Sequence, residues 1–283
     1  MILIADSGST KTDWRLITDN GKEFSFRSEG INPYFHTPES IVQTLNNIDF
    51  SPYTFYDISK VFFYSAGSNT SQNVKIMEQG FSKVFVNSEI HILHDLLGAA
   101  RALYEDDSGI AGILGTGSNS CLFVEGEIKM SLGGQGYMLG DEGSGMHLGR
   151  KVVRDFMNDL MPDDVRELFI DQYNLTKDQI TFNVYKKMFP NRFLASFSKF
   201  VNENMEHSYF QALADDAFMK YFERYIIQYP DYQQYKLRIV GSVGYYFSDL
   251  IIEMGKKYGI EVDKFIKGPI EGLVEYHIKH QNT

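Results

Sequence analysis

The sequence predicts an α/β fold made of two similarly built domains. An apolar strand, a loop of Gly, Ser and Thr, and two further strands joined by a turn occur near residue 1 and again near residue 110. With 283 residues, of which 43% are hydrophobic, the chain can bury a core in each of two domains. The repeat therefore predicts a duplicated unit whose two glycine loops face one another across a cleft.

The first domain is expected over residues 1–108. Strands are predicted where short apolar or alternating runs end at turn residues, and helices where apolar residues recur at helical spacing. The predicted strands are residues 2–5, 13–17, 23–27, 60–64, 83–86 and 89–93, and the predicted helices are 38–48 and 96–103. The acidic segment 105–109 separates the two domains and is expected to form part of a hinge.

The second domain is expected over residues 109–283, with a large helical insertion. Its predicted strands are residues 110–114, 120–124, 127–131 and 236–240. Beyond Arg150, aromatic residues and leucines at three- and four-residue spacing predict helices at 151–160, 162–173, 179–188, 192–203 and 209–227. Helices 245–258 and 268–279 follow, and the sequence leaves open that the last one packs back on the first domain.

The two glycine loops are candidates for phosphate binding. They read DSGSTKT at residues 6–12 and GTGSN at residues 115–119. Glycine lets the backbone approach an anion closely, and Ser and Thr add neutral hydrogen-bond donors. Either loop alone is more simply a hairpin turn, but two similar copies favour phosphate binding. The chain has neither GxxxxGK[ST] nor a complete GxGxxG, so P-loop and Rossmann sites lose their main support.

Composition and charge disfavour several other functions. The net charge of −10 disfavours nucleic acid and anionic membranes as partners. No apolar run approaches the roughly 20 residues of a membrane-spanning helix, and a cytoplasmic location is expected. The single cysteine, Cys121, excludes an intrachain disulfide or a thiolate cluster within one chain. A homodimer stays open on sequence alone.

Asn32 and Asp95 are candidate substrate residues, because each follows a predicted strand. Asn32 precedes a proline, and a turn asparagine is an equally simple interpretation. Asp95 precedes a helix of small residues, where aspartate is commonly the N-cap. It could also be a carboxylate presented at the carboxyl end of a strand, which is where α/β folds bind their ligands.

Four segments together resemble one family. DSGSTKTDW, GILGTGSNS, GGQGYMLGDEGS and IVGSVG are similar to the phosphate 1, phosphate 2, sugar-loop and adenosine motifs of the N-acetylglucosamine kinase and BadF/BadG/BcrA/BcrD ATPase-type family. That family belongs to the sugar kinase, Hsp70 and actin superfamily. The resemblance spans nearly the whole chain, and GTGSNS followed by GDEGS is its most specific part. It implies two ribonuclease-H-like domains that bind ATP, Mg²⁺ and a sugar.

The resemblance also implies residue roles. Asp6 would orient Mg²⁺ through water, Asp95 would be the catalytic base, and Asp141 would contact sugar hydroxyls. The residues implied for ATP and its phosphates are Gly8, Ser9, Thr10, Lys11, Thr116, Gly117, Ser118, Gly241 and Gly244. Those implied for the substrate are Asn32, Asp95, Thr116, Gly117, Gly134 and Asp141.

The chain departs from the family pattern at two places. Gln135 stands where the animal N-acetylglucosamine kinases have tryptophan, which alters the pocket expected for the acyl group. Ser7 and Ser9 replace glycines of the usual DGGGT and add hydroxyls to a phosphate loop. The family's electron-transfer ATPases hold an iron–sulfur cluster with cysteines, and zinc-bearing relatives need a cysteine cluster, so the lone Cys121 argues against both branches.

The predicted function is an ATP-dependent kinase of an amino sugar, with N-acetylglucosamine as the leading substrate. Two rivals are an ATP-driven switch that moves a partner protein and a non-catalytic sugar sensor. Asn32, Asp95 and Asp141 together favour the kinase, because a switch has no need of three hydroxyl-binding groups. Closure of the two domains on their ligands is also expected, since closure excludes water that would otherwise accept the phosphoryl group.

Overall fold

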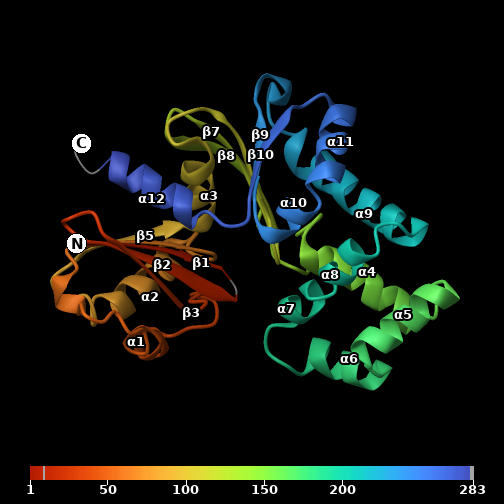
Figure 1. Ribbon diagram of the computed structural model, residues 1–283, viewed down its shortest axis with the longest axis horizontal. Coiled ribbons are helices and arrows are strands. Elements are labelled where there is room, and N and C mark those ends of the chain that lie inside the picture. The colour runs from red at the N-terminus through yellow and green to blue at the C-terminus, as the bar shows by residue number, and fades with distance from the viewer. Residues whose placement is uncertain (9, 281–283) are drawn as a thin grey trace. The chain divides into compact units, whose positions relative to one another are not determined.

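The computed structural model describes residues 1–8 and 10–280, which form two compact units (Figure 1). The first unit comprises residues 1–107 and the segment that begins at Gly268, and the second is Ser108–Lys267. Among the described residues, no helix is long and apolar enough to cross a membrane.

The first unit is built on a five-stranded sheet with the order β3-β2-β1-β4-β5. Strands β1, β2 and β3 are antiparallel neighbours, whereas β4 is parallel to β1 and β5 is parallel to β4. The strands are β1 (Ile2–Ser7), β2 (Lys11–Ile17), β3 (Glu23–Glu29), β4 (Lys60–Ser65) and β5 (Glu89–His94). The helices are α1 (Pro38–Asn46), the short η1 (Phe55–Asp57), α2 (Ser71–Phe81), α3 (Asp95–Tyr104) and α12 (Ile270–Lys279).

Alternation along β1 assigns its side chains to two faces of this sheet. Leu3 and Ala5 join Trp14 in the apolar core that also contains residues of α1 and α2. Asp6 therefore points to the opposite face, which α3 and α12 cover. The sheet thus separates an apolar core on one face from charged side chains on the other.

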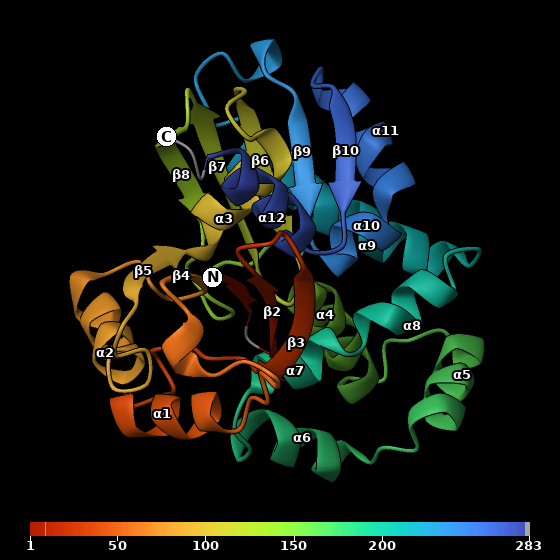
Figure 2. The ribbon, with the colours of Figure 1, turned by 60° about the vertical axis from the view of Figure 1, so that its left-hand side comes forward.

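The second unit repeats this topology. Its sheet has the order β10-β9-β6-β7-β8, with β6, β7 and β8 antiparallel and with β9 parallel to β6 and β10 parallel to β9 (Figure 2). The strands are β6 (Gly109–Leu114), β7 (Ser118–Val124), β8 (Glu127–Gly133), β9 (Leu237–Val240) and β10 (Val262–Ile266). Strand for strand the two orders match, which confirms the predicted duplicated α/β fold.

The helical insertion follows β8 and precedes β9. Its helices are α4 (Gly145–Met157), α5 (Asp163–Tyr173), α6 (Lys177–Tyr185), α7 (Pro190–Ala195), α8 (Ser198–Glu203) and α9 (Ser208–Tyr221), followed by the π-helix η2 (Phe222–Ile226) and the short η3 (Tyr232–Gln234). Figure 2 shows α5 and α6 on the side of the insertion away from the sheet of this unit. After β9 come α10 (Ser242–Tyr246) and α11 (Ser248–Tyr258).

Three local predictions were wrong, and one of them is the helix expected over residues 245–258, which is divided at Phe247 into α10 and α11. The helix expected over residues 192–203 is two helices, because Ser196 Oγ and Ser198 Oγ donate to the carbonyl oxygens of Phe193 (2.6 Å) and Ala195 (2.8 Å) where the two meet. The strand expected over residues 83–86 is a turn. There the backbone N–H of Phe85 donates to Phe81 O at 2.9 Å, and both rings pack in the core as an extension of α2.

The second unit ends at Lys267, whereas the domain expected from the sequence continued to residue 283. The last helix, α12, lies along α3 of the first unit (Figure 1). Gly272 permits this close approach, since a Cβ atom there would lie 2.6 Å from the carbonyl oxygen of Ala102. Near its end, Lys279 Nζ contacts carboxylate oxygens of Glu105 at 2.9 Å and Asp106 at 3.0 Å.

Candidate active site

Three carboxylates gather in the first unit near the carboxyl ends of β1 and β5. Asp6 pairs in register with Asp13 of β2, and Asp95 directly follows β5. Burial, followed by the negative charges of Asp95 and Asp13, raises the pKa of Asp6 to about 7, against the lowering effect of Lys11. Sequence reasoning missed Asp13, although alternation along a hairpin places it on the same face as Asp6.

These carboxylates fit the chemistry of a bound Mg²⁺. Carboxylate oxygens are ligands that Mg²⁺ prefers, and a cation would relieve the repulsion that raises the pKa of Asp6. Within residues 1–8 and 10–280, no three His, Cys, Asp or Glu side chains are grouped closely enough to hold a metal by themselves. That agrees with the usual mode of Mg²⁺ binding, in which water and substrate phosphates complete the coordination.

Asp95 is the first residue of α3, and the N-cap is His94. His94 Nδ1 lies 3.2 Å from the backbone nitrogen of Leu96 and 3.3 Å from Asp95 Oδ1. As a hydrogen-bond acceptor, His94 Nδ1 caps the first turn of α3 through the N–H of Leu96. The N-cap position is thus held by His94. Burial raises the pKa of Asp95, against the lowering effects of His94 and of the backbone N–H groups of Leu96 and of Asp95 itself.

The first glycine loop is a tight turn between β1 and β2. The backbone N–H of Gly8 donates to Lys11 O at 3.0 Å, and Thr10 O accepts from the N–H of Gly30 at 3.2 Å. Lys11 begins β2 with an exposed side chain whose Nζ bonds to Asp13. Ser9, also predicted to bind phosphate, lies outside the described residues. The turn thus places a lysine beside the carboxylates.

Asn32 is buried in the loop that follows β3, and its side chain shapes that loop. Asn32 Oδ1 accepts a hydrogen bond from the N–H of Tyr34 at 2.9 Å, as in an Asx turn. A Cβ atom at Gly67 would lie 2.9 Å from the same oxygen. The structure therefore supports the turn interpretation of Asn32. Its side-chain Nδ2 group could still donate a hydrogen bond to a sugar hydroxyl.

The second glycine loop, between β6 and β7, occupies the same place in the topology as the first, but a different hydrogen bond closes it. The N–H of Gly115 donates to Gly117 O at 3.0 Å. Its outer carbonyls hold the start of α4, since Gly145 N–H donates to Gly115 O at 2.9 Å and Met146 N–H to Thr116 O at 3.1 Å. The first N–H groups of α4 are therefore already bonded within the protein, so any contact of this loop with an anion would come from the N–H groups of the turn itself.

Asp141 lies against this second loop. Its Oδ1 accepts from the N–H of Ser118 at 3.1 Å, and a Cβ atom at Gly117 would lie 3.0 Å from both of its carboxylate oxygens. The residue has φ 61°, a left-handed conformation in which aspartate is among the better-tolerated residues. Burial raises the pKa of Asp141 to about 6, opposed by the Ser118 hydrogen bond and supported by the charge of Glu142.

Gly134 and Gln135 complete the loop on the other side. The N–H of Gly134 donates to Ser118 O at 3.2 Å, and a Cβ atom there would lie 2.9 Å from Asn119 Nδ2. Gln135 is exposed, with its Oε1 next to Gly140. A larger side chain at position 135 can therefore reach solvent beside the Asp141 loop.

Gly241 and Gly244 bring the end of β9 against the end of β6. Gly241 has φ 125°, and a Cβ atom there would lie 2.2 Å from Leu114 O. At Gly244, a Cβ atom would lie 2.3 Å from the Ile239 side chain. Only glycine allows the backbone after β9 to lie this close to the turn that carries Thr116.

The structure thus groups the predicted residues within each unit. Asp6, Lys11 and Asp95 belong to one cluster of the first unit, to which Asp13 and His94 are added. In the second unit, Gly117, Ser118, Gly134 and Asp141 are in direct contact, and Gly241 borders the same turn. Each unit carries a glycine turn beside buried carboxylates, an arrangement suited to binding phosphates and hydroxyls.

Two sheets of one topology, each with such a turn between its first two strands, define a duplicated sugar-kinase-like protein of the actin-like ATPase class. A ROK family glucokinase from Streptomyces griseus, solved with glucose and AMPPNP, has this fold. It matches with a TM-score of 0.54 and 14% identity over 99% of each chain. A candidate N-acetylglucosamine kinase from Chromobacterium violaceum matches with a TM-score of 0.77 and 16% identity, covering 97% of this chain and 98% of that chain. At these identities the likeness shows the fold alone.

A third solved structure shows the family. A candidate N-acetylglucosamine kinase from Porphyromonas gingivalis is 37% identical, with a TM-score of 0.92, and the match covers 99% of this chain and 100% of that chain. The chain belongs to the same family as that protein, within the actin-like ATPase sugar kinases. No protein-family model and no curated protein sequence matches the chain.

Proposed function

We propose that the protein is an ATP-dependent sugar kinase that transfers the γ-phosphoryl group to a hydroxyl of an amino sugar, with N-acetylglucosamine as the leading substrate. The observation that carries the proposal is Asp95, a carboxylate at the end of β5 whose pKa is raised by burial. A raised pKa makes a carboxylate a better proton acceptor. Membership of the family of the Porphyromonas gingivalis protein supports a sugar as the substrate, and that protein's name supports the amino sugar.

In the proposed reaction, Asp95 accepts the proton of the attacking hydroxyl as the new oxygen–phosphorus bond forms. The bond from the γ-phosphorus to the bridging oxygen breaks, and ADP leaves with that oxygen. Asp141 and the Asn32 amide orient sugar hydroxyls through hydrogen bonds. Such alignment supplies much of the rate of phosphoryl transfer.

The glycine turns provide the nucleotide contacts of the proposal. Backbone N–H groups of Thr10, Thr116 and Gly117, with Lys11, bind the phosphates. The N–H of Gly8 closes the first turn, where Gly8 lets the backbone approach the phosphates. The backbone at Gly241 and Gly244 lies against the adenosine. Mg²⁺, when bound, supplies charge neutralisation at the phosphates, and Asp6 with its neighbour Asp13 would hold it through water. The proposal includes a cytoplasmic location, where ATP is available, and it needs no nucleic acid or membrane.

A coupled assay of ADP release over a panel of sugars tests this function. N-acetylglucosamine should give the largest kcat/KM, ahead of glucosamine, glucose and N-acetylmannosamine, and mass spectrometry should find one added phosphoryl group on the sugar. ATP hydrolysis that no sugar stimulates would refute the kinase and support the ATP-driven switch. Binding of sugar without ADP release would support the sensor.

A further inference from the structure

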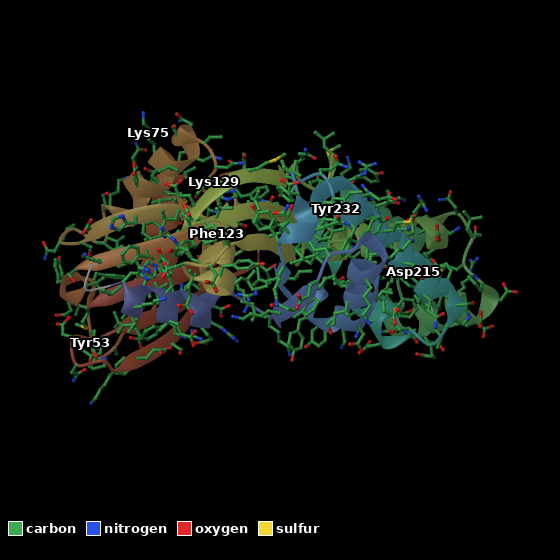
Figure 3. All side chains as sticks on the ribbon, turned by 90° about the horizontal axis from the view of Figure 1, so that it is seen from above. Tyr53, Lys75, Phe123, Lys129, Asp215 and Tyr232 are labelled. Carbon is green, nitrogen blue, oxygen red and sulfur yellow. The ribbon has the colours of Figure 1, made fainter. Side chains whose placement is uncertain are left out.

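A cavity of about 270 Å³ lies between two helices of the second unit and belongs to none of the candidate residues above. Its α4 wall carries residues at positions i, i+3, i+4 and i+7, which share one face of a helix, and its α9 wall carries a pair at i and i+4. The lining residues are His147, Arg150, Lys151, Arg154, Asp216 and Lys220. In Figure 3, the labelled Asp215 lies on α9 and precedes the lining residue Asp216 in the sequence.

The cavity holds four cationic side chains and one carboxylate, in a chain whose net charge is −10. Lys151 and Lys220 share the carboxylate of Asp216, with Lys220 Nζ 2.8 Å from Oδ2. Burial acts to raise the pKa of Asp216, but hydrogen bonds from the two lysines lower it to about 2. This carboxylate is therefore ionised and already paired with both lysines.

The positive charges of the two arginines are only weakly neutralised by nearby carboxylates. Arg154 Nε lies 3.4 Å from Asp155 Oδ1, and Asp155 also accepts a hydrogen bond from the Tyr209 hydroxyl at 3.0 Å. Arg150 Nη1 donates to the carbonyl oxygen of Tyr137 at 3.3 Å, and among residues 1–8 and 10–280 it has no carboxylate within ion-pair distance. Like charges held this close repel each other, and an anion would relieve that repulsion.

An ordinary solvated helix face does not explain the whole arrangement. The Lys151 side chain is only 15% exposed and His147 is 5% exposed. His147 Nδ1 accepts from the N–H of Gly143 at 3.0 Å, so in the neutral ring Nε2 carries the proton. Burial, with the charges of Arg150 and Lys151, lowers the pKa of His147 to about 4. The ring therefore stays neutral near pH 7 and can act as a hydrogen-bond donor.

We propose that this cavity is an anion site for the phosphoryl group of a small phosphomonoester. Arginine forks match phosphate oxygens in pairs, and lysines add point charge. The volume is below the range typical of drug-sized ligand sites, which favours a compact phosphorylated molecule. The site is tied to the Asp141 loop, because His147 bonds to Gly143 of that loop. The proposal stands whether or not the protein is a kinase.

Binding is measured by calorimetry with inorganic phosphate and with glucose 6-phosphate as probes, on the full chain in the absence of turnover. The double variant Lys220→Gln, Arg154→Gln leaves Asp216 paired with Lys151, so it should stay folded. It should bind both probes at least tenfold more weakly. The matched control Lys199→Gln, Lys187→Gln removes the same charge from exposed positions of the insertion and should bind as the wild type does.

The variant Lys11→Gln tests whether phosphate binds at the glycine turn of the first unit instead of in the cavity. Retained binding in Lys11→Gln, together with a His147 ring NMR shift on adding phosphate, supports the cavity. Binding that is lost in Lys11→Gln but unchanged in the double variant overturns the proposal. If the double variant unfolds, Arg150→Gln replaces it, with the same expected loss. Tighter binding of glucose 6-phosphate than of inorganic phosphate identifies a phosphomonoester site, and the reverse identifies a site for free phosphate.

Discussion

Replacing Asp95 with asparagine should remove the proposed base and leave the fold intact. Loss of a general base typically lowers the rate 10²- to 10⁴-fold, which corresponds to about 3–5 kcal/mol of activation free energy. The stability cost should be small. Asp95 contributes at most about 1 kcal/mol as a charge in the first turn of α3, and His94 remains as the N-cap. Removing its negative charge also relieves the repulsion that raises the pKa of Asp6.

The assay is ADP release at saturating sugar and ATP, together with calorimetry of a non-hydrolysable ATP analogue and urea unfolding. Nucleotide affinity should stay within a few fold of wild type. Asp249→Asn is the matched control, because Asp249 is an exposed acidic residue in the first turn of α11. A folded Asp95→Asn protein that keeps turnover within tenfold of wild type would refute the assignment of Asp95 as the base.

Three further predictions follow from the second unit. In the folded protein the Asp141 carboxyl has a pKa of about 6, against an ordinary 3.8. Folding therefore favours the protonated carboxyl, and the free energy of unfolding that it contributes below pH 4 is lost as the pH rises to about 6. Asp141→Asn keeps the left-handed conformation and an oxygen that accepts from Ser118. Its free energy of unfolding, measured with urea, should equal that of wild type at pH 4 and exceed it by about 3 kcal/mol at pH 8. A difference that does not vary with pH would contradict this. Gly241→Ala should cost at least about 2 kcal/mol in urea unfolding, because of its φ and its contact with Leu114 O, whereas Gly115→Ala, with open space around it, should cost under about 1 kcal/mol. Gln135→Trp should change the ratio of kcat/KM for N-acetylglucosamine to that for glucose, and equal ratios would remove Gln135 from the sugar pocket.

Much of the fold could be predicted from the sequence, because local periodicity and turn residues indicate the repeated order of strand, glycine loop and hairpin. The contact of Asp141 with Gly117 and Ser118 could not, since it depends on a chain reversal between residues 118 and 141. His94 was missed because a histidine before an aspartate has no distinctive spacing. Its cap role appears only when its Nδ1 is placed beside Leu96 N–H.

The errors have similar physical causes. Residues 192–203 have helical periodicity throughout, and periodicity does not reveal that two serines bond back to carbonyls and interrupt the helix. Residues 83–86 are apolar enough for a strand. They form a turn instead, in which the Phe85 ring stacks on Phe81 in the core. The roles of the site residues and the expected closure of the two domains stay predictions. Solution scattering with and without both ligands would test the closure.

The return of α12 to the first unit has a consequence for biosynthesis. In the completed unit, the His277 ring stacks on Phe62 with centroids 3.9 Å apart, and its Nε2 lies 2.9 Å from the Tyr64 hydroxyl. During synthesis this helix emerges only after all of residues 108–267, so until then the β4 side chains beneath it lack their cover. The second unit, whose residues are consecutive, can fold first, although domains generally fold in order from the N-terminus. A ribosome-bound chain stopped before Gly268 should therefore present an incomplete first unit to chaperones and proteases.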